Sequence, residues 1–232
     1  MTFIIAEIGV NWDGNYDLLK QMMEESKNSG CDAVKLQAFN ENMVKDHPES
    51  ARLIKTAVTK SNVEKINKIS KTVGIEWFCT PMFPEAIEFL NPFVKRYKVR
   101  AFDGKILLEN KTSELLDRLL KTNKEIIVSS EISPKNSSYY NHPNLKWLYV
   151  VSKYPCEMSD LDFSNIKDFN GYSNHCPKTI APLTAANLGA KIIEIHITSD
   201  KSKSFVDNNV SFDYNELREL VNSIRHSEKL EK

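Results

Sequence analysis

The first run of strand length is FIIAEI, at Phe3–Ile8, and the next is AVKL, at Ala33–Leu36. The intervening stretch Tyr16–Ser29 repeats apolar residues at the spacing of an amphipathic helix. A helix between two strands is a connection that suits parallel pairing, because parallel strands cannot be joined by a tight turn. This first strand–helix–strand unit therefore predicts a parallel sheet with helices on its surface.

The same alternation continues along the chain. Further strand-like runs lie at Glu76–Cys79, Arg96–Val99, Glu125–Val128, Trp147–Val151, Gly171–Tyr172 and Lys191–Ile197. Further helices are predicted at Ser61–Val73, Glu85–Leu90, Ser113–Lys121, Ser164–Phe169, Thr179–Leu188 and Tyr214–Ser227. This α/β pattern predicts a (β/α)8 TIM barrel that fills residues 1–232 as a single catalytic domain, because barrels of about this length are routinely one domain.

One connection departs from the pattern. Ser133–Asn144, after the fifth strand, contains two prolines and three asparagines without an apolar period, so the helix there is predicted to be missing or very short. We expect apolar barrel surface to be left uncovered at this point and a homo-oligomer to use that face. The alternative fold is an open doubly wound sheet, which normally has a glycine-rich turn after its first strand. Only Gly9 and Gly14 lie near that turn, so the barrel is favoured.

Composition limits the function classes. Lysine and arginine number 31, as do aspartate and glutamate, so no net field favours nucleic acid or an anionic membrane, and small-molecule substrates are expected. Four cysteines without paired spacing suit reduced thiols. Neither a cleavable leader nor an apolar stretch of bilayer length precedes or follows Phe3, and we expect a cytoplasmic protein.

Polar residues stand at the ends of nearly all the predicted strands. In a (β/α)8 barrel the active site lies at the carboxyl ends of the strands, so these side chains are expected to converge. A single serine or threonine could equally hydrogen-bond a loop backbone, but the coincidence over eight strands weakens that alternative. The candidates are Glu7, Lys35, Gln37, Thr80, Lys98, Ser129, Ser152, Tyr154, Ser173, His175 and His196.

Two lysines and two histidines carry most of the chemical argument. Lys35 and Lys98 lie inside apolar strands, where a charge that cannot reach water needs an anionic partner, although a lysine can also extend its ammonium to solvent. They favour a phosphate or carboxylate ligand. His175 and His196 end adjacent strands, which lie about 4.8 Å apart, so both imidazoles could reach one divalent ion together with Glu7. The alternative is that each histidine is structural.

The ordered series of motifs resembles the sialic acid (N-acetylneuraminate) synthase family, from Phe3 to about Arg225. The matching strings are IAEIGVN at 5–11, DAVKLQ at 32–37, CTP at 79–81, YKV at 97–99, IIVS at 126–129, YP at 154–155, GYSNH at 171–175 and GAKIIEIH at 189–196. The resemblance implies an enzyme of nonulosonic acid biosynthesis. Such a transferase condenses phosphoenolpyruvate with an N-acyl-hexosamine, giving a nine-carbon 2-keto sugar acid and phosphate.

The resemblance also implies a role for each matched residue. Glu7, Lys35 and Lys98 are expected to be catalytic, and His175 and His196 to hold a divalent metal, Mn²⁺ or Mg²⁺. The expected substrate contacts divide into a phosphoenolpyruvate group and a sugar group. The first comprises Lys35, Thr80, Lys98, Ser129 and Ser173, and the second comprises Gln37, Tyr154 and Asp207, with Asp103 and Ser152 at positions where the family usually has other residues.

The chain also departs from the family pattern. Ala101 and Asp103 replace usual family residues, as do Ser152 and Asn174, and Ser129 is followed by Ser130, Glu131 and Ile132 where the family usually has Thr, Gly and Met, so the acceptor sugar is left open. The chain stops at Lys232 without the small antifreeze-like domain that usually caps the sugar. Truncation, a separate capping protein or a different acceptor would each account for this.

Two other functions remain open. One is a non-catalytic relative that binds phosphoenolpyruvate or a sugar. The other is a barrel lyase or epimerase, disfavoured because no lysine stands out as an imine-forming nucleophile.

Overall fold

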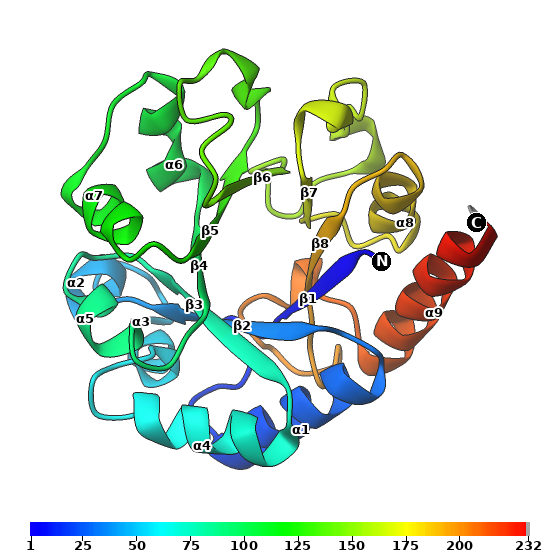
Figure 1. Ribbon diagram of the computed structural model, residues 1–232. Helices are drawn as coiled ribbons and strands as arrows, with labels where there is room; N and C mark the ends of the chain where they lie inside the picture. The colour runs from blue at the N-terminus through cyan, green and yellow to red at the C-terminus, as the bar shows by residue number, and fades with distance from the viewer. Residues whose placement is uncertain (231–232) are drawn as a thin grey trace.

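A computed structural model describes residues 1–230, and within them the strands form a closed parallel barrel in the order β1 to β8 (Figure 1). Pairing of β1 with β8 closes the ring. The predicted TIM barrel is confirmed. The strands are β1 (Phe3–Glu7), β2 (Ala33–Ala38), β3 (Glu76–Pro81), β4 (Arg96–Val99), β5 (Glu125–Ser130), β6 (Leu145–Tyr149), β7 (Gly171–Asn174) and β8 (Ile192–His196).

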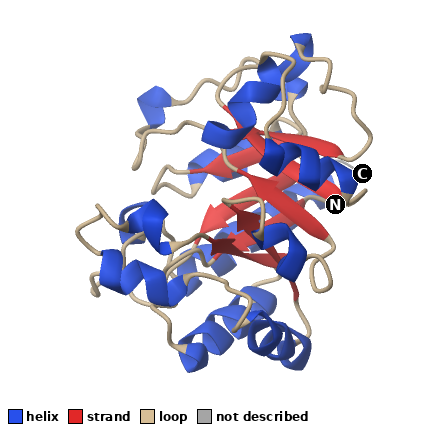
Figure 2. Cartoon of the chain, turned by 90° about the vertical axis from the view of Figure 1, so that its left-hand side faces the viewer, coloured by secondary structure: helices blue, strands red, loops and turns tan. Residues whose placement is uncertain are grey.

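Helices surround the strands (Figure 2). Six of them lie where the sequence predicts them: α1 (Tyr16–Asn28), α4 (Val63–Val73), α5 (Ala86–Leu90), α7 (Glu114–Lys121), α8 (Ile180–Asn187) and α9 (Tyr214–Leu230). Local caps set several ends. The side chain of Asn15 accepts hydrogen bonds from the first turn of α1, and Gly74 ends α4 in the left-handed conformation. α9 packs against both α8 and α1 and so closes the outer layer.

Six short elements were not predicted, and two of them are the 3₁₀ turns η3 (Met158–Asp160) and η5 (Asn208–Val210). After β2 the chain forms α2 (Glu41–Val44), α3 (Ser50–Leu53) and the 3₁₀ turn η1 (Ile54–Thr56), and after β4 it forms α6 (Ala101–Leu108). α2, α3 and η1 span too few residues for an apolar period to be visible. α6 lacks a clear amphipathic pattern, and Phe102 on it is 84% exposed. These elements lie at the carboxyl ends of the strands, beside the candidate site.

The predicted helix at Ser164–Phe169 is wrong, because only a single 3₁₀ turn, η4 (Ile166–Asp168), forms there. Its last residue is tied to another loop: Asp168 accepts hydrogen bonds from Ser133 Oγ at 2.6 Å and Lys135 Nζ at 3.3 Å. Two residues later, the side chain of Asn170 accepts a hydrogen bond from the backbone nitrogen of Trp147 at 2.7 Å. Side chains suited to turns therefore prevail over the weak helical pattern.

The missing helix after β5 is confirmed, since that connection contains only the 3₁₀ turn η2 (Pro134–Asn136) (Figure 1). The connection covers the barrel with its own side chains. Tyr139 and Tyr140 pack against the main core, and the buried Ser137 hydroxyl donates to the carbonyl of Leu107 at 2.6 Å. The homo-oligomer stays a prediction, but this covered face no longer supports it.

Two further observations concern the whole chain. No helix within residues 1–230 combines the length and the apolar character needed to cross a bilayer. Each of the cysteines Cys31, Cys79, Cys156 and Cys176 is buried and free.

Strand alternation decides which residues face the barrel axis. Residues two apart on a strand share a face, so Lys35 and Gln37 point to the same side of β2, and Glu194 and His196 to the same side of β8. The strand register places Glu7 level with both Lys35 and His196. The intervening residues, such as Val34 and Ile195, are fully buried beneath the helices. Polar groups are thereby collected inside the barrel while its outer face stays apolar.

Gly171 is the position where the barrel tolerates no side chain. A Cβ built there would overlap the backbone carbonyl of Ile192 on β8. We expect Gly171→Ala to lower the free energy of unfolding by about 3 kcal/mol or more, measured by urea denaturation. Gly189→Ala is the control: it has no atom within 4 Å of the added Cβ but a φ of +105°, so it should cost only about 1–2 kcal/mol of backbone strain. Equal losses would contradict a steric cause at Gly171.

Candidate active site

A cavity of about 440 Å³ opens at the carboxyl ends of the strands. It brings together twelve of the thirteen side chains predicted from the sequence. Those lining it are Glu7, Lys35, Gln37, Thr80, Lys98, Ser129, Ser152, Tyr154, Ser173, His175, His196 and Asp207.

Asp103 is the exception. Within the described residues it is absent from the cavity lining, and its carboxylate accepts a hydrogen bond from Arg100 Nε at 2.6 Å. The unpredicted helix α6 is the reason, because the chain turns into a helix directly after β4 and carries Asp103 aside. Arg100 lines the cavity instead. A substrate contact by Asp103 is therefore not supported by its position.

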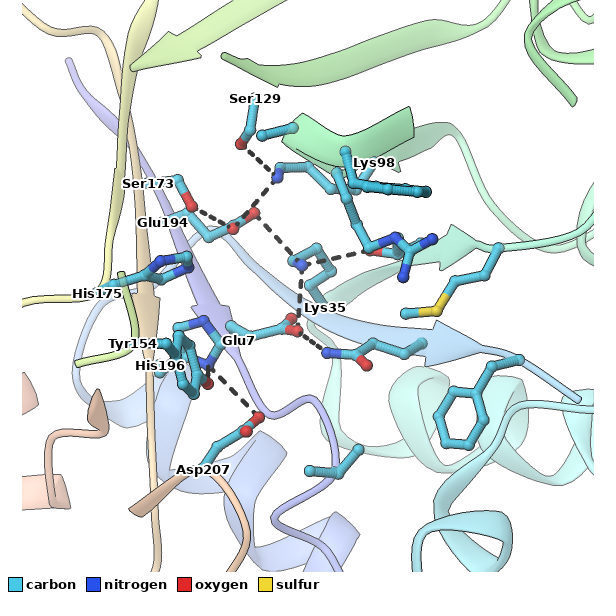
Figure 3. Close-up of a pocket in the computed structure, with 18 of the residues that line it drawn as sticks. Glu7, Lys35, Lys98, Ser129, Tyr154, Ser173, His175, Glu194, His196 and Asp207 are labelled. Carbon is cyan, nitrogen blue, oxygen red and sulfur yellow. Dashed lines mark hydrogen bonds and ion pairs between the residues drawn. The ribbon is translucent and has the colours of Figure 1, made fainter. Parts of the chain in front are cut away.

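Glu194 lies at the floor of the cavity between the two buried lysines (Figure 3). Its Oε1 is 3.5 Å from Lys98 Nζ, and its Oε2 is 3.6 Å from Lys35 Nζ. The Ser173 hydroxyl also donates to Oε1 at 2.7 Å. The lysines have further partners, since Lys98 Nζ donates to Ser129 Oγ at 2.7 Å and Lys35 Nζ to Thr80 Oγ1 at 3.3 Å. We call Lys35, Lys98 and Glu194 the charged floor.

Burial and mutual attraction compete in setting the charges of this floor. Burial alone raises the pKa of Glu194, but attraction to Lys35 and Lys98 outweighs it and holds the pKa below its usual value. Burial lowers the pKa of Lys98 to about 8, with Glu194 acting in the opposite direction. For Lys35 the two carboxylates, Glu194 and Glu7, outweigh burial and raise the pKa. Glu194 is thus the internal counterion of two lysines.

Glu194 is not among the site residues predicted from the sequence. The signal for it was present, because Glu194-Ile195-His196 places Glu194 two residues before a predicted site histidine and therefore on the same face of the strand. A carboxylate in an otherwise apolar strand needs a buried cationic partner, as the two lysines do.

Glu7 is fully buried and has one oxygen free for chemistry. Its Oε1 accepts a hydrogen bond from Gln37 Nε2 at 2.8 Å and lies 3.1 Å from Lys35 Nζ. Its Oε2 has no hydrogen-bond partner among the described residues. Burial raises the pKa of Glu7, and Lys35 offsets this only in part. A carboxyl group with these properties is suited to exchange a proton near neutral pH.

Gly9 lets three polar side chains approach one another. It has a φ of +52°, and a Cβ there would lie 3.1 Å from Asp207 Oδ2, 3.1 Å from Glu7 Oε1 and 3.2 Å from Gln37 Nε2. A larger residue would push these groups apart as well as strain the backbone. The turn after β1 is therefore built for convergence at the cavity, rather than for binding a dinucleotide.

His175 and His196 form a pair of neutral imidazoles with ring centroids 5.5 Å apart. Burial lowers the pKa of His175 to about 4 and, together with the neighbouring His175, holds the pKa of His196 well below its usual value. The Nδ1 of His175 lies 2.8 Å from the carbonyl oxygen of Val151, which only accepts, so Nδ1 carries the hydrogen and Nε2 keeps its lone pair.

The pair fits a divalent metal in part. Neutral imidazole is the form that binds metal, and a backbone carbonyl that orients a ligand histidine is a usual arrangement. Residues 1–230 contain no cluster of three or more histidine, cysteine, aspartate or glutamate side chains in a metal-binding arrangement, so substrate or water would have to complete the coordination. The unpaired Glu7 Oε2 supplies a further oxygen atom in the same cavity.

Tyr154 and Asp207 flank the histidine pair. The Tyr154 ring lies edge-on to both imidazoles, at centroid distances of 4.9 Å and 5.6 Å, and its hydroxyl is 3.4 Å from His196 Nδ1. Asp207 Oδ2 is 3.7 Å from the same nitrogen. Burial raises the pKa values of Tyr154 and Asp207. Together they form a polar side of the cavity next to the two histidines.

Comparison with known proteins identifies the family to which this barrel belongs. Residues 22–232 match the model of the NeuB family. This chain belongs to the NeuB family. It is 30% identical to the N,N'-diacetyllegionaminic acid synthase of Legionella pneumophila, an alignment that covers 97% of this chain and 72% of that protein. It is also 30% identical to an uncharacterised protein of Methanocaldococcus jannaschii, over 99% of this chain and 72% of that one.

A solved structure of a NeuB-type enzyme has the same fold. The N-acetylneuraminic acid synthetase of Leptospira borgpetersenii, crystallised with citrate, superposes with a TM-score of 0.84 at 26% identity. The match covers 99% of this chain and 84% of that one. The family resemblance expected from the sequence motifs is confirmed, and the proteins of Legionella pneumophila and Leptospira borgpetersenii are named as sugar-acid synthases.

Removal of the Glu194 charge tests the charged floor of this NeuB-family barrel. Glu194→Gln leaves Lys98 without its carboxylate partner and Lys35 with Glu7 alone, so we expect about 3 kcal/mol less stability and a larger stabilisation by inorganic phosphate than in the unsubstituted protein. Thermal unfolding with and without phosphate measures both. The control is Glu76→Gln, which weakens the outer ion pair with Arg96 at 2.7 Å and should leave the phosphate response unchanged. An equal phosphate response in all three proteins would contradict this assignment.

The lowered pKa of Lys98 predicts an alkaline limit for anion binding. Below pH 8 the group is an ammonium and attracts an anion, and as the pH rises through about 8 the charge is lost. We expect kcat/KM for an anionic substrate to fall about tenfold per pH unit above that point. In Lys98→Arg the charge persists beyond about pH 12, so the limb should disappear. An unchanged alkaline limb in this variant would assign it to another group.

Proposed function

We propose that this protein condenses phosphoenolpyruvate with the aldehyde of an N-acyl-hexosamine or a related aldose, giving a nonulosonic 2-keto sugar acid and phosphate. The observation that carries the proposal is the charged floor, in which two buried ammonium groups share one internal carboxylate directly beside Glu7 and the two histidines. Relatives named as legionaminic and pseudaminic acid synthases support the reaction class.

The charged floor suits a small, highly charged donor. Lys35 and Lys98 supply positive charge, while the hydroxyls of Thr80, Ser129 and Ser173 supply hydrogen bonds around it. All five side chains are buried, and water therefore screens their attraction for an anion little. Phosphoenolpyruvate carries both a phosphate and a carboxylate, so one lysine can serve each group. Holding the donor in one orientation lowers the entropic part of the barrier.

His175 and His196 would hold the divalent metal, Mn²⁺ or Mg²⁺. When bound, such an ion acts as a Lewis acid on the aldehyde oxygen of the acceptor. Tyr154 packs edge-on against both imidazoles and keeps their positions relative to each other. Gln37 and Asp207, at the same level of the cavity, present polar atoms to the hydroxyls of the sugar.

The bond changes balance with Glu7 as the proton carrier. C3 of phosphoenolpyruvate forms a bond to the aldehyde carbon, and the aldehyde oxygen takes a proton from the Glu7 carboxyl group. Water adds to the resulting cation at C2 and gives a proton back to Glu7. The tetrahedral intermediate then breaks the bond between C2 and the phosphate oxygen, and its C2 hydroxyl gives its proton to the departing phosphate, which leaves the ketone and hydrogen phosphate. The free Oε2 and raised pKa of Glu7 suit both transfers.

A second candidate is a lyase that forms an imine on a lysine. The observation in its favour is the pKa of Lys98, which burial lowers to about 8 and which makes the neutral, nucleophilic amine accessible. Against it, Lys98 Nζ already contacts Ser129 and Glu194. Reduction with borohydride in the presence of a ketose would attach the sugar to Lys98 in a lyase and leave a condensing synthase unmodified.

The proposed condensation predicts release of phosphate from phosphoenolpyruvate that requires an aldose and a divalent metal. Glu7→Gln should reduce kcat by about 10²–10⁴-fold, because it removes the proton carrier, while KM for phosphoenolpyruvate changes little. Phosphate release and the mass of the product are measured together. Glu109→Gln, in a surface pair with Lys111 at 3.1 Å, is the control and should keep full activity. Full activity of Glu7→Gln would refute the role of Glu7.

His175→Ala tests the metal position in the same assay. We expect it to raise the metal concentration needed for half-maximal activity by about 10-fold or more. His142→Ala, in the connection after β5, is the matched control. If no N-acyl-hexosamine or simple aldose releases phosphate at any metal concentration, the proposed function is wrong.

A further inference from the structure

Cys156 and Cys176 are a pair of buried, free thiols that the proposed reaction does not use. Cys156 lies in the connection after β6, and Cys176 directly follows His175 at the end of β7. Burial raises the pKa of both thiols, and each thiol shifts the pKa of the other, so the two side chains are neighbours. The Cys176 Sγ also donates a hydrogen bond to the Met158 Sδ at 3.7 Å. Three sulfur atoms are thus gathered within reach of a cavity histidine.

The backbone aligns these two cysteines for a covalent bond. The backbone nitrogen of Cys156 donates to the carbonyl oxygen of His175 at 3.1 Å. In a parallel pair of strands this bond sets residues 156 and 176 opposite each other, at the interstrand spacing of about 4.8 Å. A disulfide joins residues whose Cα atoms lie about 4.4–6.8 Å apart. The two cysteines can therefore be linked without a rearrangement of the barrel.

Cys156 anchors a stretch of chain that is otherwise exposed. It is the one buried residue between residues 152 and 159, which we call the surface segment. Polar ties of the surface segment, such as the ion pair of Lys153 with Asp160 at 2.8 Å, lie near solvent and contribute little to stability. A segment held in this way opens locally at far lower cost than the barrel unfolds. Local opening makes the Cys156 thiol accessible to a small oxidant.

The other two cysteines lack this arrangement. The charged neighbours that shift the pKa of Cys31, which lies just before β2, are Asp32 and Arg225 rather than a second thiol. Cys79 lies within β3, and the pairing of that strand with β2 and β4 opposes local opening. Cys31 is nevertheless buried and free, as Cys156 is, and therefore provides a matched control.

We propose that Cys156 and Cys176 form a reversible disulfide when the protein meets hydrogen peroxide, and that this bond holds the surface segment against the end of β7. Peroxide oxidises the Cys156 thiol to a sulfenic acid and is itself reduced to water. The Cys176 sulfur then attacks the sulfenic sulfur, and its proton leaves with the hydroxyl group as a second water. Two thiols and one peroxide thus give one disulfide and two waters. A dithiol reductant restores the free thiols by exchange.

The disulfide acts on the side of the cavity that contains the two histidines. Tyr154, two residues before Cys156, packs its ring edge-on against His175 and His196 (Figure 3). His175 directly precedes Cys176. The bond therefore ties the segment that carries Tyr154 to the strand end that carries His175, and the oxidation state sets how freely this side of the cavity moves. Formation of the bond requires no sugar, phosphoenolpyruvate or metal, so it goes beyond the proposed condensation and is tested without it.

Treatment of the folded protein with hydrogen peroxide, followed by peptide mass mapping, tests the pair. We expect the peptides of Cys156 and Cys176 to be recovered joined, with the loss of two hydrogen atoms, and the free thiols to fall from four to two. Dithiothreitol should restore all four. Cys156→Ser should abolish the joined peptide, whereas Cys31→Ser should leave it in place. Thiols that stay free after the half-exposed Met158 has become a sulfoxide, or a joined peptide with another cysteine, would overturn the proposal.

Hydrogen exchange measured by mass spectrometry tests the restraint on the surface segment. We expect its amides to exchange about 10-fold more slowly, or slower still, in the oxidised protein, because the disulfide removes openings in which Cys156 leaves its place. The amides of α4 should exchange alike in both forms. Dithiothreitol reduces the disulfide but not methionine sulfoxide, so the fast rate should return with it. Equal rates in the oxidised and reduced protein, or slow exchange that persists after reduction, would overturn the restraint.

Discussion

The site depends on one buried carboxylate, Glu194, lying between two buried ammonium groups. Removing any of these three charges from water is costly, and only their mutual attraction and the hydroxyls around them make the arrangement stable. The three residues come from β2, β4 and β8, so the closed strand register must hold before the charges meet. The charged floor can therefore form only when the barrel is closed, and the closed barrel holds the two lysines within ion-pair distance of Glu194.

An arriving anion changes this balance in a direction useful for catalysis. The two lysines exceed Glu194 by one positive charge, and Glu7 is poised to be neutral because burial raises its pKa. A highly charged donor on the lysines adds negative charge near Glu7, which favours the protonated carboxyl group further. In the proposed condensation, donor binding thus favours the protonated form of Glu7, which supplies the proton for the aldehyde oxygen. The same coupling makes the order of binding physically consequential, because the acceptor meets Glu7 in its acidic form.

The sequence predicts the strand-borne parts of this site well and the loop-borne parts poorly. Lys35 and His196 follow from strand alternation and the position of active sites in barrels. Glu194 obeys the same alternation but is not among the predicted site residues, although it is the carboxylate that pairs with both lysines of the floor. Asp103 was misplaced because α6, which has no clear amphipathic pattern, turns it toward Arg100. The apolar cavity residues Val44 and Leu53 could not be foreseen, since the helices α2 and α3 that carry them have four residues each and show no period.

This division between strands and loops has a consequence for specificity. Lys35 and Gln37 lie within β2, where a change of register would disrupt pairing with both neighbours, whereas Phe39 lies one residue past the strand and Val44 and Leu53 lie in the connection beyond. In the proposed reaction the donor and metal residues are therefore held by the barrel itself, while the residues proposed to contact the acceptor include several that lie where substitutions and insertions disturb no ladder. Relatives of one fold whose names specify different sugar acids are what such an arrangement allows. We therefore expect the loop-borne side chains around the cavity mouth, rather than Lys35, Lys98 and Glu194, to determine which acceptor this chain takes.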